Sequence, residues 1–309
     1  MDDGARLFTE TQSRLLAEHH GYMAADHGID YRVVTGRELG DIDRRAADAI
    51  AKLRIGESPE ARRGLLLIVD AESDLVRLEV GYGLEGVFPD AFVAYVEARQ
   101  MVPFFQAGRV ADGILATTEL IIARVQRAKA GGGYEGEAWF AGSGGGGAKS
   151  KAEIGAGYER PAPGVTTSAR AGRSPGETLA AYLAAMEAHD AAADSALYTP
   201  ESRAMLARWV MTRAQMDNVV KTYRGCGTAT ERRDSSGALA VLRYPIAARQ
   251  CSPWFFQRAG DDWQLDLTMM QSAIRFGRDN SWRLVPGVPH PYVFAFDDWR
   301  FDGNGFPVE

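Results

Sequence analysis

The apolar positions of the first 128 residues follow two spacings, one typical of helices and one typical of strands. Helical spacing predicts helices over residues 5–26, 41–53 and 109–126, with a further helix beginning at Pro89. Continuous apolar runs predict buried strands over residues 29–35 and 64–69. Residues 75–80 alternate between apolar and polar side chains, which predicts a strand with one polar face. This order of elements is typical of a small α/β sandwich.

The pattern changes twice in the rest of the chain. Residues 129–174 have no apolar period and are rich in Gly, Ala, Ser and Pro, so we expect a flexible linker there. Residues 175–221 show helical spacing again, and four strand patterns joined by tight turns follow. We therefore expect two domains, an α/β domain over residues 1–128 and an α+β domain over residues 175–309.

Composition and charge exclude several classes of protein. The chain has 309 residues, of which 46% are hydrophobic and 25% are charged, as expected of a globular protein with substantial cores. Its net charge of -6 argues against a nucleic-acid partner, which would require a basic surface. No apolar run is long enough for a transmembrane segment. Asp2 and Asp3 follow Met1 directly, unlike a signal peptide, so either the protein is cytoplasmic or its targeting or anchor segment is absent from this chain.

A glycine-rich motif follows the third predicted strand. Residues 81–86 read Gly-Tyr-Gly-Leu-Glu-Gly, which fits the G-x-G-x-x-G pattern of dinucleotide-binding loops. Three features argue against a bound dinucleotide: the next helix begins late, at Pro89, the preceding strand has a polar face, and Glu85 would place a carboxylate beside the pyrophosphate. The glycines would equally serve a tight loop that binds no ligand.

The residues around this motif resemble the TPM domain family, which includes YgcG-like proteins and thylakoid-lumen photosystem repair relatives. The resemblance spans about residues 2–128 and is carried by Asp2-Asp3, Ile55-Gly56, residues 64–69, residues 76–86, Pro89-Asp90-Ala91, Pro103-Phe104-Phe105, Gly108 and Gly113. It implies a Rossmann-like α/β/α sandwich and a location on the outer side of a membrane. It also implies divalent-cation binding, as in some members, and phosphatase activity, as in some plant relatives. The family often has Asp-Arg where this chain has Asp74-Leu75, which puts phosphatase activity in doubt if that arginine contacts phosphate.

Five carboxylates are candidate ligands of a divalent cation. We expect them to converge at one end of the sheet, where α/β proteins place their ligands. Ca²⁺ is favoured because it takes many oxygen ligands in flexible loops, and Mg²⁺ or Mn²⁺ are alternatives. The candidates are Asp2, Asp3, Asp70, Glu85 and Asp90. A structural alternative is that Asp3 and Asp90 cap helices and Glu85 is solvated.

The second domain resembles the cone-shaped NTF2-like superfamily in the order of its helices and strands and in the apolar pattern of its last hairpin.

The second domain holds Cys226 and Cys251, the only cysteines, and we predict a disulfide between them, with two buried free thiols as the alternative. A hairpin centred on residues 235–236 would pair Cys226 with Pro245, so the chain must bend after Pro245 to bring the cysteines together.

Two further polar groups in the second domain have both a chemical and a structural interpretation. His189 and Asp190 end its first helix and are a conceivable acid/base pair, although neighbours on a helix do not face each other. Asp298, Asp302 and Asn304 lie in an acidic C-terminal segment, but their spacing favours a polar turn over a calcium loop.

These observations favour a cell-envelope accessory or scaffold protein whose TPM-like domain binds a divalent cation. Its partner would be an envelope or membrane-associated protein, and its location the periplasm or cell envelope, with the cytoplasm as the alternative. The alternative function is a metal-assisted phosphatase acting on phosphomonoesters, in which a carboxylate such as Asp90 or Asp3 positions water. A dinucleotide-binding module is a weaker alternative. The ligand of the second domain is left open.

Overall fold

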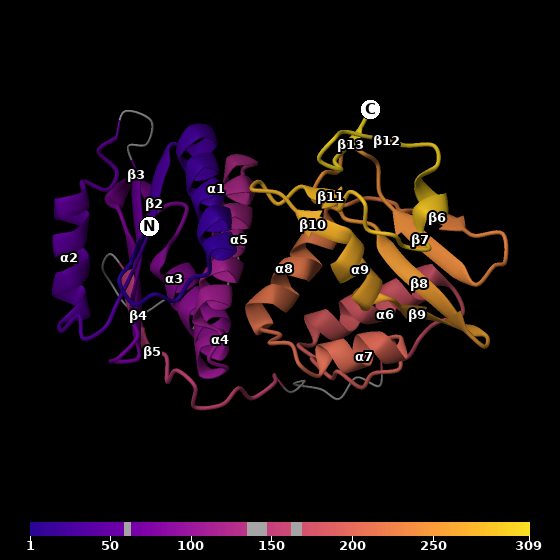
Figure 1. The fold of residues 1–309 in the computed structure, drawn as a ribbon, viewed down its shortest axis with the longest axis horizontal. Coiled ribbons are helices and arrows are strands. Elements are labelled where there is room, and N and C mark those ends of the chain that lie inside the picture. The colour runs from indigo at the N-terminus through magenta and orange to yellow at the C-terminus, as the bar shows by residue number, and fades with distance from the viewer. Residues whose placement is uncertain (59–62, 135–146, 162–168) are drawn as a thin grey trace. The chain divides into compact units, whose positions relative to one another are not determined.

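The computed structural model describes residues 1–58, 63–134, 147–161 and 169–309 (Figure 1). The chain divides into two compact units, Met1–Glu159 and Arg160–Glu309. The fold is mixed α/β, with helices and several sheets.

Unit 1 is built on a five-stranded sheet with the order β1-β2-β3-β4-β5. The strands are β1 (Asp2–Asp3), β2 (Ile29–Gly36), β3 (Arg63–Asp70), β4 (Leu75–Val80) and β5 (Gly147–Lys151). β1, β2 and β3 are parallel, whereas β4 is antiparallel to both of its neighbours. The three strand patterns predicted from the sequence correspond to β2, β3 and β4.

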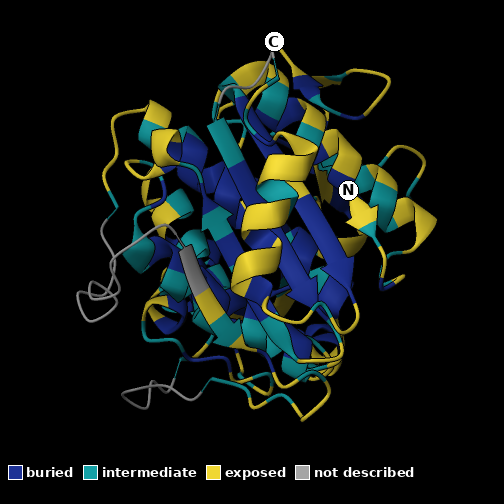
Figure 2. Cartoon of the chain, turned by 90° about the vertical axis from the view of Figure 1, so that its left-hand side faces the viewer, coloured by how far each residue is buried: buried dark blue, intermediate teal, exposed yellow. Residues whose placement is uncertain are grey.

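Helices lie on both faces of this sheet. α2 covers one face, and α1, α3, α4 and α5 lie on the other side (Figure 1). Their bounds are α1 (Glu10–His27), α2 (Ile42–Leu53), α3 (Asp90–Val96), α4 (Val102–Gln106) and α5 (Val110–Lys129), with a 3-10 turn η1 (Tyr82–Leu84) and a π-helical turn η2 (Glu97–Met101). Figure 2 looks at the α2 side and shows buried strands beneath the exposed outer surface of that helix.

The first helix begins later than its apolar pattern predicts. α1 starts at Glu10, because Thr9 and Gln12 form a capping box that fixes its N-terminus. Asp3 therefore does not cap this helix. Its carboxylate instead accepts the backbone N–H groups of Leu7 and Phe8, in the turn before the helix.

Part of the segment expected to be a linker belongs to unit 1. β5 pairs with β4 in a register that places Lys151 opposite Leu75. The Ala152 N–H also donates to the Asp74 carbonyl at 2.7 Å. These contacts are mainly between backbone groups, so the strand has no apolar period that the sequence could reveal. Residues 135–146 and 162–168 of the expected linker lie outside the described residues.

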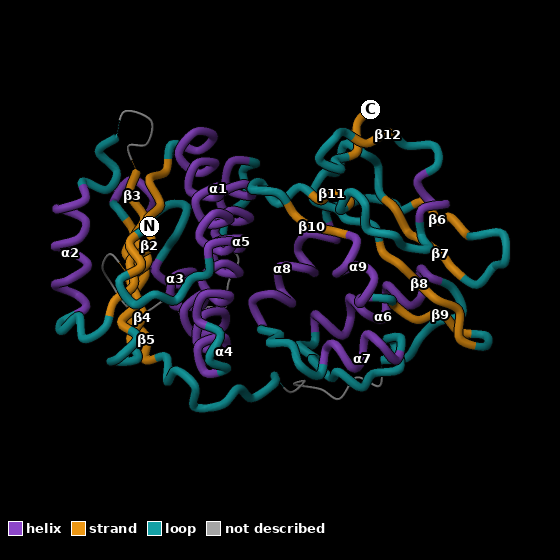
Figure 3. The backbone as a smooth tube through the Cα atoms, in the orientation of Figure 1, coloured by secondary structure: helices purple, strands orange, loops and turns teal. Residues whose placement is uncertain are grey.

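Unit 2 places three helices before an antiparallel meander (Figure 3). The helices are α6 (Pro175–Glu187), α7 (Pro200–Leu206) and α8 (Arg213–Arg224), and the sheet order is β6-β7-β8-β9. Its strands are β6 (Thr230–Arg233), β7 (Leu239–Arg243), β8 (Trp254–Ala259) and β9 (Asp262–Leu265). After them come α9 (Leu267–Ala273), β10 (Ile274–Phe276), β11 (Trp282–Leu284), a 3-10 turn η4 (Val293–Phe296), β12 (Arg300–Phe301) and β13 (Pro307–Val308).

The centre of the unit 2 meander, formed by β7 and the first half of β8, is buried on both faces, whereas β6 is largely exposed. Successive residues of a strand point to opposite sides, and Phe256 joins a core shared with the helices α6, α7 and α8, while Phe255 joins a second core with Trp282 and Tyr292. The C-terminal segment therefore forms part of the second core.

The first hairpin of unit 2 has a different register from the one expected. Arg233 pairs with Ala240, whereas a two-residue turn at 235–236 would pair it with Ala238. The Asp234 N–H donates to the Leu239 carbonyl at 3.1 Å, so the loop contains four residues instead of two. Cys226 also lies before β6, just after α8, so the strand register does not fix its position.

Candidate functional site

Strand direction separates the candidate carboxylates of unit 1 into two groups. Asp3 lies beside Thr35, and Asp70 lies beside Gly36, at the end where the parallel strands finish. We call this the carboxyl end of the sheet. Because β4 runs back along β3, the loop that contains Glu85 lies at the opposite end. The five carboxylates therefore do not converge at one end of the sheet, contrary to the expectation from the sequence.

Asp70 is fully buried at the carboxyl end, and its carboxylate accepts four backbone N–H groups. The donors lie in two loops: those of Glu38 and Leu39 follow β2, at 3.0 and 2.7 Å, and those of Glu72 and Ser73 follow β3, at 3.1 and 3.2 Å. Burial alone would raise the pKa of Asp70, but hydrogen bonds from the N–H groups of Ser73, Leu39 and Glu72 and from the Ser73 side chain outweigh burial and lower it below 3.8.

Asp3 is held in a similar way. Its Oδ1 accepts the Thr35 hydroxyl at 2.5 Å and the Leu7 N–H at 3.0 Å, and its Oδ2 accepts the Phe8 N–H at 3.1 Å. Burial opposes ionisation, yet the hydrogen bonds from Thr35, Leu7 and Phe8 leave the pKa of Asp3 below its ordinary value. The preceding residue, Asp2, is exposed.

The carboxyl end does not fit a divalent cation. Cation ligands need oxygen lone pairs directed at a common point, but those of Asp3 and Asp70 already receive N–H and O–H groups. The positive ends of these donor dipoles face the carboxylates, which opposes a second positive charge there. Across the described ranges, no group of three or more His, Cys, Asp or Glu side chains could hold a metal ion.

The glycine loop at the other end is shaped by close backbone contacts. A Cβ atom on Gly81 would lie 2.9 Å from the Gly64 carbonyl oxygen, and one on Gly83 would lie 3.1 Å from Cγ of Arg63. The loop continues into η1 instead of opening a helix directly, and its feeding strand β4 is antiparallel. These features differ from the βαβ context of a dinucleotide-binding fingerprint, and close packing explains Gly81 and Gly83, whereas a Cβ on Gly86 would meet no atom within 4 Å.

The side chains of this loop point to different environments. Leu84 is fully buried, whereas Tyr82 is 90% exposed. Glu85 is exposed, and Asp90 is half-buried in the first turn of α3. Tyr82 and Glu85 are therefore the side chains of the loop best placed to meet another molecule.

Arg124 supports the exit of the glycine loop and was not singled out from the sequence. Its side chain is 3% exposed, and its guanidinium donates to the carbonyls of Val87, Gly132 and Gly133 at 2.7 to 3.0 Å. It also lies 5.9 Å from the ring of Tyr134. An arginine four and three residues after the buried Leu120 and Ile121 was the available signal, because this spacing places it on their helix face.

Glu97 is a second fully buried carboxyl group of unit 1 that sequence analysis missed. It lies in the π-helical turn η2 and accepts the Leu78 N–H and the Ser150 hydroxyl, both at 2.9 Å. Burial raises its pKa to about 8, which makes the neutral acid the main form at pH 7. Its position, four residues from both Val93 and Met101, places it on a buried helical stripe.

The polar groups singled out in unit 2 have structural partners. His189 Nε2 lies 2.8 Å from Asp217 Oδ1 instead of pairing with Asp190, whose carboxylate accepts the Ala192 N–H. Asp298 binds Arg243 through two hydrogen bonds, and this contact lowers the pKa of Asp298 to about 2. The Asp302 carboxylate accepts the N–H groups of Asn304 and Phe306, as expected of a polar turn.

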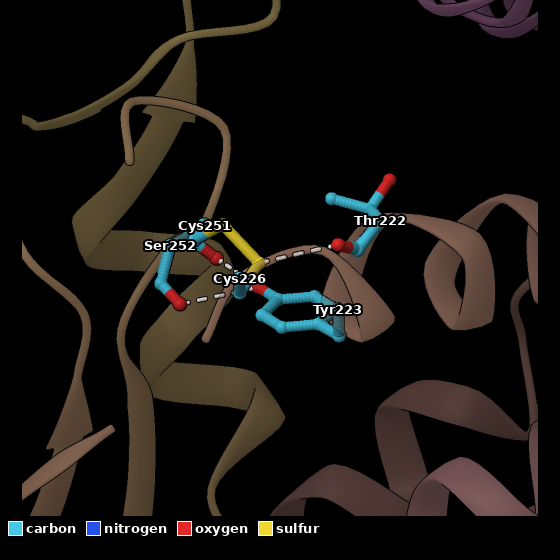
Figure 4. Close-up of a disulfide and its surroundings, with 5 residues drawn as sticks. All are labelled: Thr222, Tyr223, Cys226, Cys251 and Ser252. Carbon is cyan, nitrogen blue, oxygen red and sulfur yellow. Dashed lines mark hydrogen bonds between the residues drawn. A yellow bond between two sulfur atoms is a disulfide. The ribbon is translucent and has the colours of Figure 1, made fainter. Parts of the chain in front are cut away.

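Cys226 and Cys251 are joined by a disulfide with a Cα–Cα distance of 5.7 Å (Figure 4). Cys226 follows the end of α8, and Cys251 closes a turn before β8, where its N–H donates to the Ala248 carbonyl. Beside the bridge, the Tyr223 hydroxyl lies 2.7 Å from the Ser252 hydroxyl. The bend that the sequence required after Pro245 is this turn.

Comparison with known proteins identifies a domain in unit 1. Residues 1–124 match the family model described as the TPM domain. A solution NMR structure of the N-terminal domain of a protein from P. gingivalis is 25% identical and covers 44% of this chain and 86% of that chain, with a TM-score of 0.37. No curated protein matches this chain. Within the described residues, no helix has the length and apolar character needed to cross a membrane.

Proposed function

Taking residues 1–124 as a TPM domain, we propose that this protein is an accessory or scaffold protein of the cell envelope, and that the glycine loop of its TPM domain binds a protein partner. The observation that carries the proposal is Tyr82, which is 90% exposed on a turn whose neighbour Leu84 is fully buried. Exposed tyrosines on fixed backbones are typical anchors of protein interfaces, because they supply contact area at low entropic cost.

Several contacts hold the loop in one conformation. The Gly81 N–H donates to the Gly64 carbonyl at 2.9 Å, and the Leu84 N–H donates to the Gly81 carbonyl at 2.8 Å. Arg124 then fixes the Val87 carbonyl, just after the loop. A loop held in this way loses little conformational freedom when a partner binds, which favours affinity.

The cation enters this proposal through the glycine loop alone. Glu85 is exposed and Asp90 is half-buried, so these two carboxylates are the remaining candidate ligands for Ca²⁺, or for Mg²⁺ or Mn²⁺. Two carboxylates supply fewer than the six to eight oxygens that Ca²⁺ takes, so water or a partner would complete the shell. Calorimetric titration with CaCl₂, MgCl₂ and MnCl₂ should give a heat that is lost in the Glu85→Gln/Asp90→Asn double variant. Equal heats from both proteins would contradict this assignment.

An envelope location is supported by the disulfide between Cys226 and Cys251. Such bonds persist in oxidising compartments and are rare in the cytosol of mesophiles. Thiol counting under denaturing, non-reducing conditions should find no free thiol in protein taken from its native compartment, whereas two thiols would contradict the location.

For unit 2, the NTF2-like fold stays part of the proposal and is supported by the order of three helices before a meander.

Site-directed photo-crosslinking tests the binding surface. A photoreactive amino acid at position 82 should capture a discrete protein from the cell envelope. The matched control is position 53, because Leu53 is 44% exposed on α2 and lies outside the glycine loop. A product formed equally from both positions would contradict the proposal, as would one unchanged by Gly81→Ala, which disturbs the loop backbone.

A further inference from the structure

The two loops around Asp70 resemble a receptor for an anion. Four backbone N–H groups from separate segments point at one carboxylate. Each segment also contains a charged residue in the left-handed backbone region, Glu38 with φ 53° and Asp74 with φ 55°. Concave sets of N–H groups that include left-handed residues form nests, which bind anions in many proteins.

We infer that the carboxyl end of this TPM domain is an anion receptor filled by the chain's own Asp70, and that it binds small carboxylates when Asp70 is shortened, but not divalent cations. The inference is independent of the proposed glycine-loop function, because it concerns the opposite end of the sheet.

The charges around the nest support this assignment. Arg37 lies in the same loop as Glu38 and pairs with Glu72 at 3.5 Å, so a cationic and an anionic side chain flank the nest together. At Asp70 itself, hydrogen bonds from backbone N–H groups and from the Ser73 side chain stabilise the ionised form. A carboxylate such as formate presents the same two oxygens to these donors.

Loss of the carboxylate should release both loops. Without Asp70, the N–H groups of residues 38, 39, 72 and 73 would lose their shared acceptor, and since residues 38, 72 and 73 are exposed, water can reach these groups. We therefore expect the Asp70→Ala variant to expose these amides to solvent exchange, even where the rest of unit 1 stays folded.

Hydrogen–deuterium exchange measured on the full chain tests the inference locally. Peptides that contain residues 36–40 and 71–74 should exchange faster in Asp70→Ala than in the wild type. Sodium formate should restore slow exchange in the variant with a saturable concentration dependence, whereas sodium chloride at the same ionic strength should not. CaCl₂ should leave the exchange of these peptides unchanged in the wild type.

Two further variants keep the test decisive. Asp70→Ser also shortens the side chain and removes the carboxylate, so it replaces Asp70→Ala if that variant is unfolded. Asp2→Asn changes an exposed neighbouring carboxylate outside the nest and should leave the exchange of both peptides as in the wild type. The inference is overturned if formate and chloride act alike on Asp70→Ala, or on Asp70→Ser where that variant replaces it, or if CaCl₂ slows exchange in the wild type but not in Asp70→Ser.

Discussion

Asp70 and Glu97 lie in two regions of the same domain, and both side chains are fully buried, yet their environments act on them in opposite directions. At the carboxyl end, four backbone N–H groups surround Asp70, and its pKa is lowered. Beneath β4 and β5, Glu97 has one N–H and one hydroxyl partner, and burial raises its pKa to about 8. Hydrogen bonds therefore outweigh burial at Asp70, whereas burial outweighs the two hydrogen bonds at Glu97.

This difference gives the two regions different roles in the fold. Asp70 is a fixed anion that holds the loops after β2 and β3 together. Glu97 is mainly a neutral acid that connects η2 to β4 and to the edge strand β5. We expect the first region to weaken in acid and the second to weaken as the pH rises.

The largest effect on the free energy of unfolding is expected from removing the negative charge of Asp70. Asp70→Asn should lower the free energy of unfolding at pH 7 by on the order of 4 kcal/mol, because an amide group would face donors that need an acceptor. Because the folded-state pKa of Asp70 is depressed, its contribution is present above about pH 4 and is lost as the pH falls through the lowered value. Urea denaturation of both proteins between pH 2 and 7 should therefore show their stabilities converging in acid. A constant difference would contradict the role of the charge.

Glu97→Gln should raise the free energy of unfolding at alkaline pH, whereas Asp70→Asn should lower it at pH 7. The wild type loses stability as the pH rises from about 4.5 to about 8, because the unfolded chain ionises first and the buried acid resists ionisation. Gln has no such loss, so the variant should exceed the wild type by on the order of 3 kcal/mol at pH 9 and should match it near pH 4. Denaturant titration at the two pH values measures this. Equal stabilities at pH 9 would show that Glu97 ionises freely.

The glycine loop is a third region, held by backbone hydrogen bonds of Gly81 and Leu84 and, at its exit, by the Arg124 guanidinium. Gly81→Ala should cost about 2 kcal/mol, because the new Cβ would lie 2.9 Å from the Gly64 carbonyl oxygen. This loss should be the same at pH 4, 7 and 9. Gly86→Ala is the matched control, since a Cβ there meets no atom within 4 Å, and it should be nearly neutral. A pH-dependent loss for Gly81→Ala would couple this loop to one of the two acids.

The smallest effect is expected at the partner of Glu97. Ser150→Ala removes one hydroxyl donor and should lower stability by about 1 kcal/mol at pH 7. It should also raise the pKa of Glu97 further, because that hydrogen bond opposes the effect of burial. A stability curve whose alkaline loss shifts to lower pH would contradict the assigned contact.

Much of the first sheet could be predicted from the sequence. The apolar runs at 29–35 and 64–69 and the alternation at 75–80 correspond to β2, β3 and β4, because buried parallel strands and a half-exposed strand impose these patterns. β5 could not be predicted, since its pairing with β4 depends on backbone groups. The separation of Glu85 from Asp70 could have been predicted: four residues between β3 and β4 are too few for a parallel crossover.

The hydrogen-bond partners of Asp70 and Glu97 could not be predicted from the sequence. Asp70 receives N–H groups from residues more than 30 positions earlier as well as from its own turn, and a backbone donor leaves no mark on residue identity. Ser150 is 53 residues from Glu97 and lies in the segment expected to be a linker. Glu97 itself was detectable, because its helical spacing from Val93 and Met101 places a carboxyl group on a buried stripe.

An NMR titration of the side-chain carboxyl carbons, with ¹³C-labelled Asp and Glu, tests most directly whether hydrogen bonds dominate at Asp70 and burial dominates at Glu97. The Asp70 resonance, assigned by comparison with Asp70→Asn, should titrate below 3.8, or not at all above the acid unfolding transition. The Glu97 resonance, assigned with Glu97→Gln, should titrate near pH 8. Ordinary titration of both groups near pH 4 would contradict the account, as would a raised pKa for Asp70.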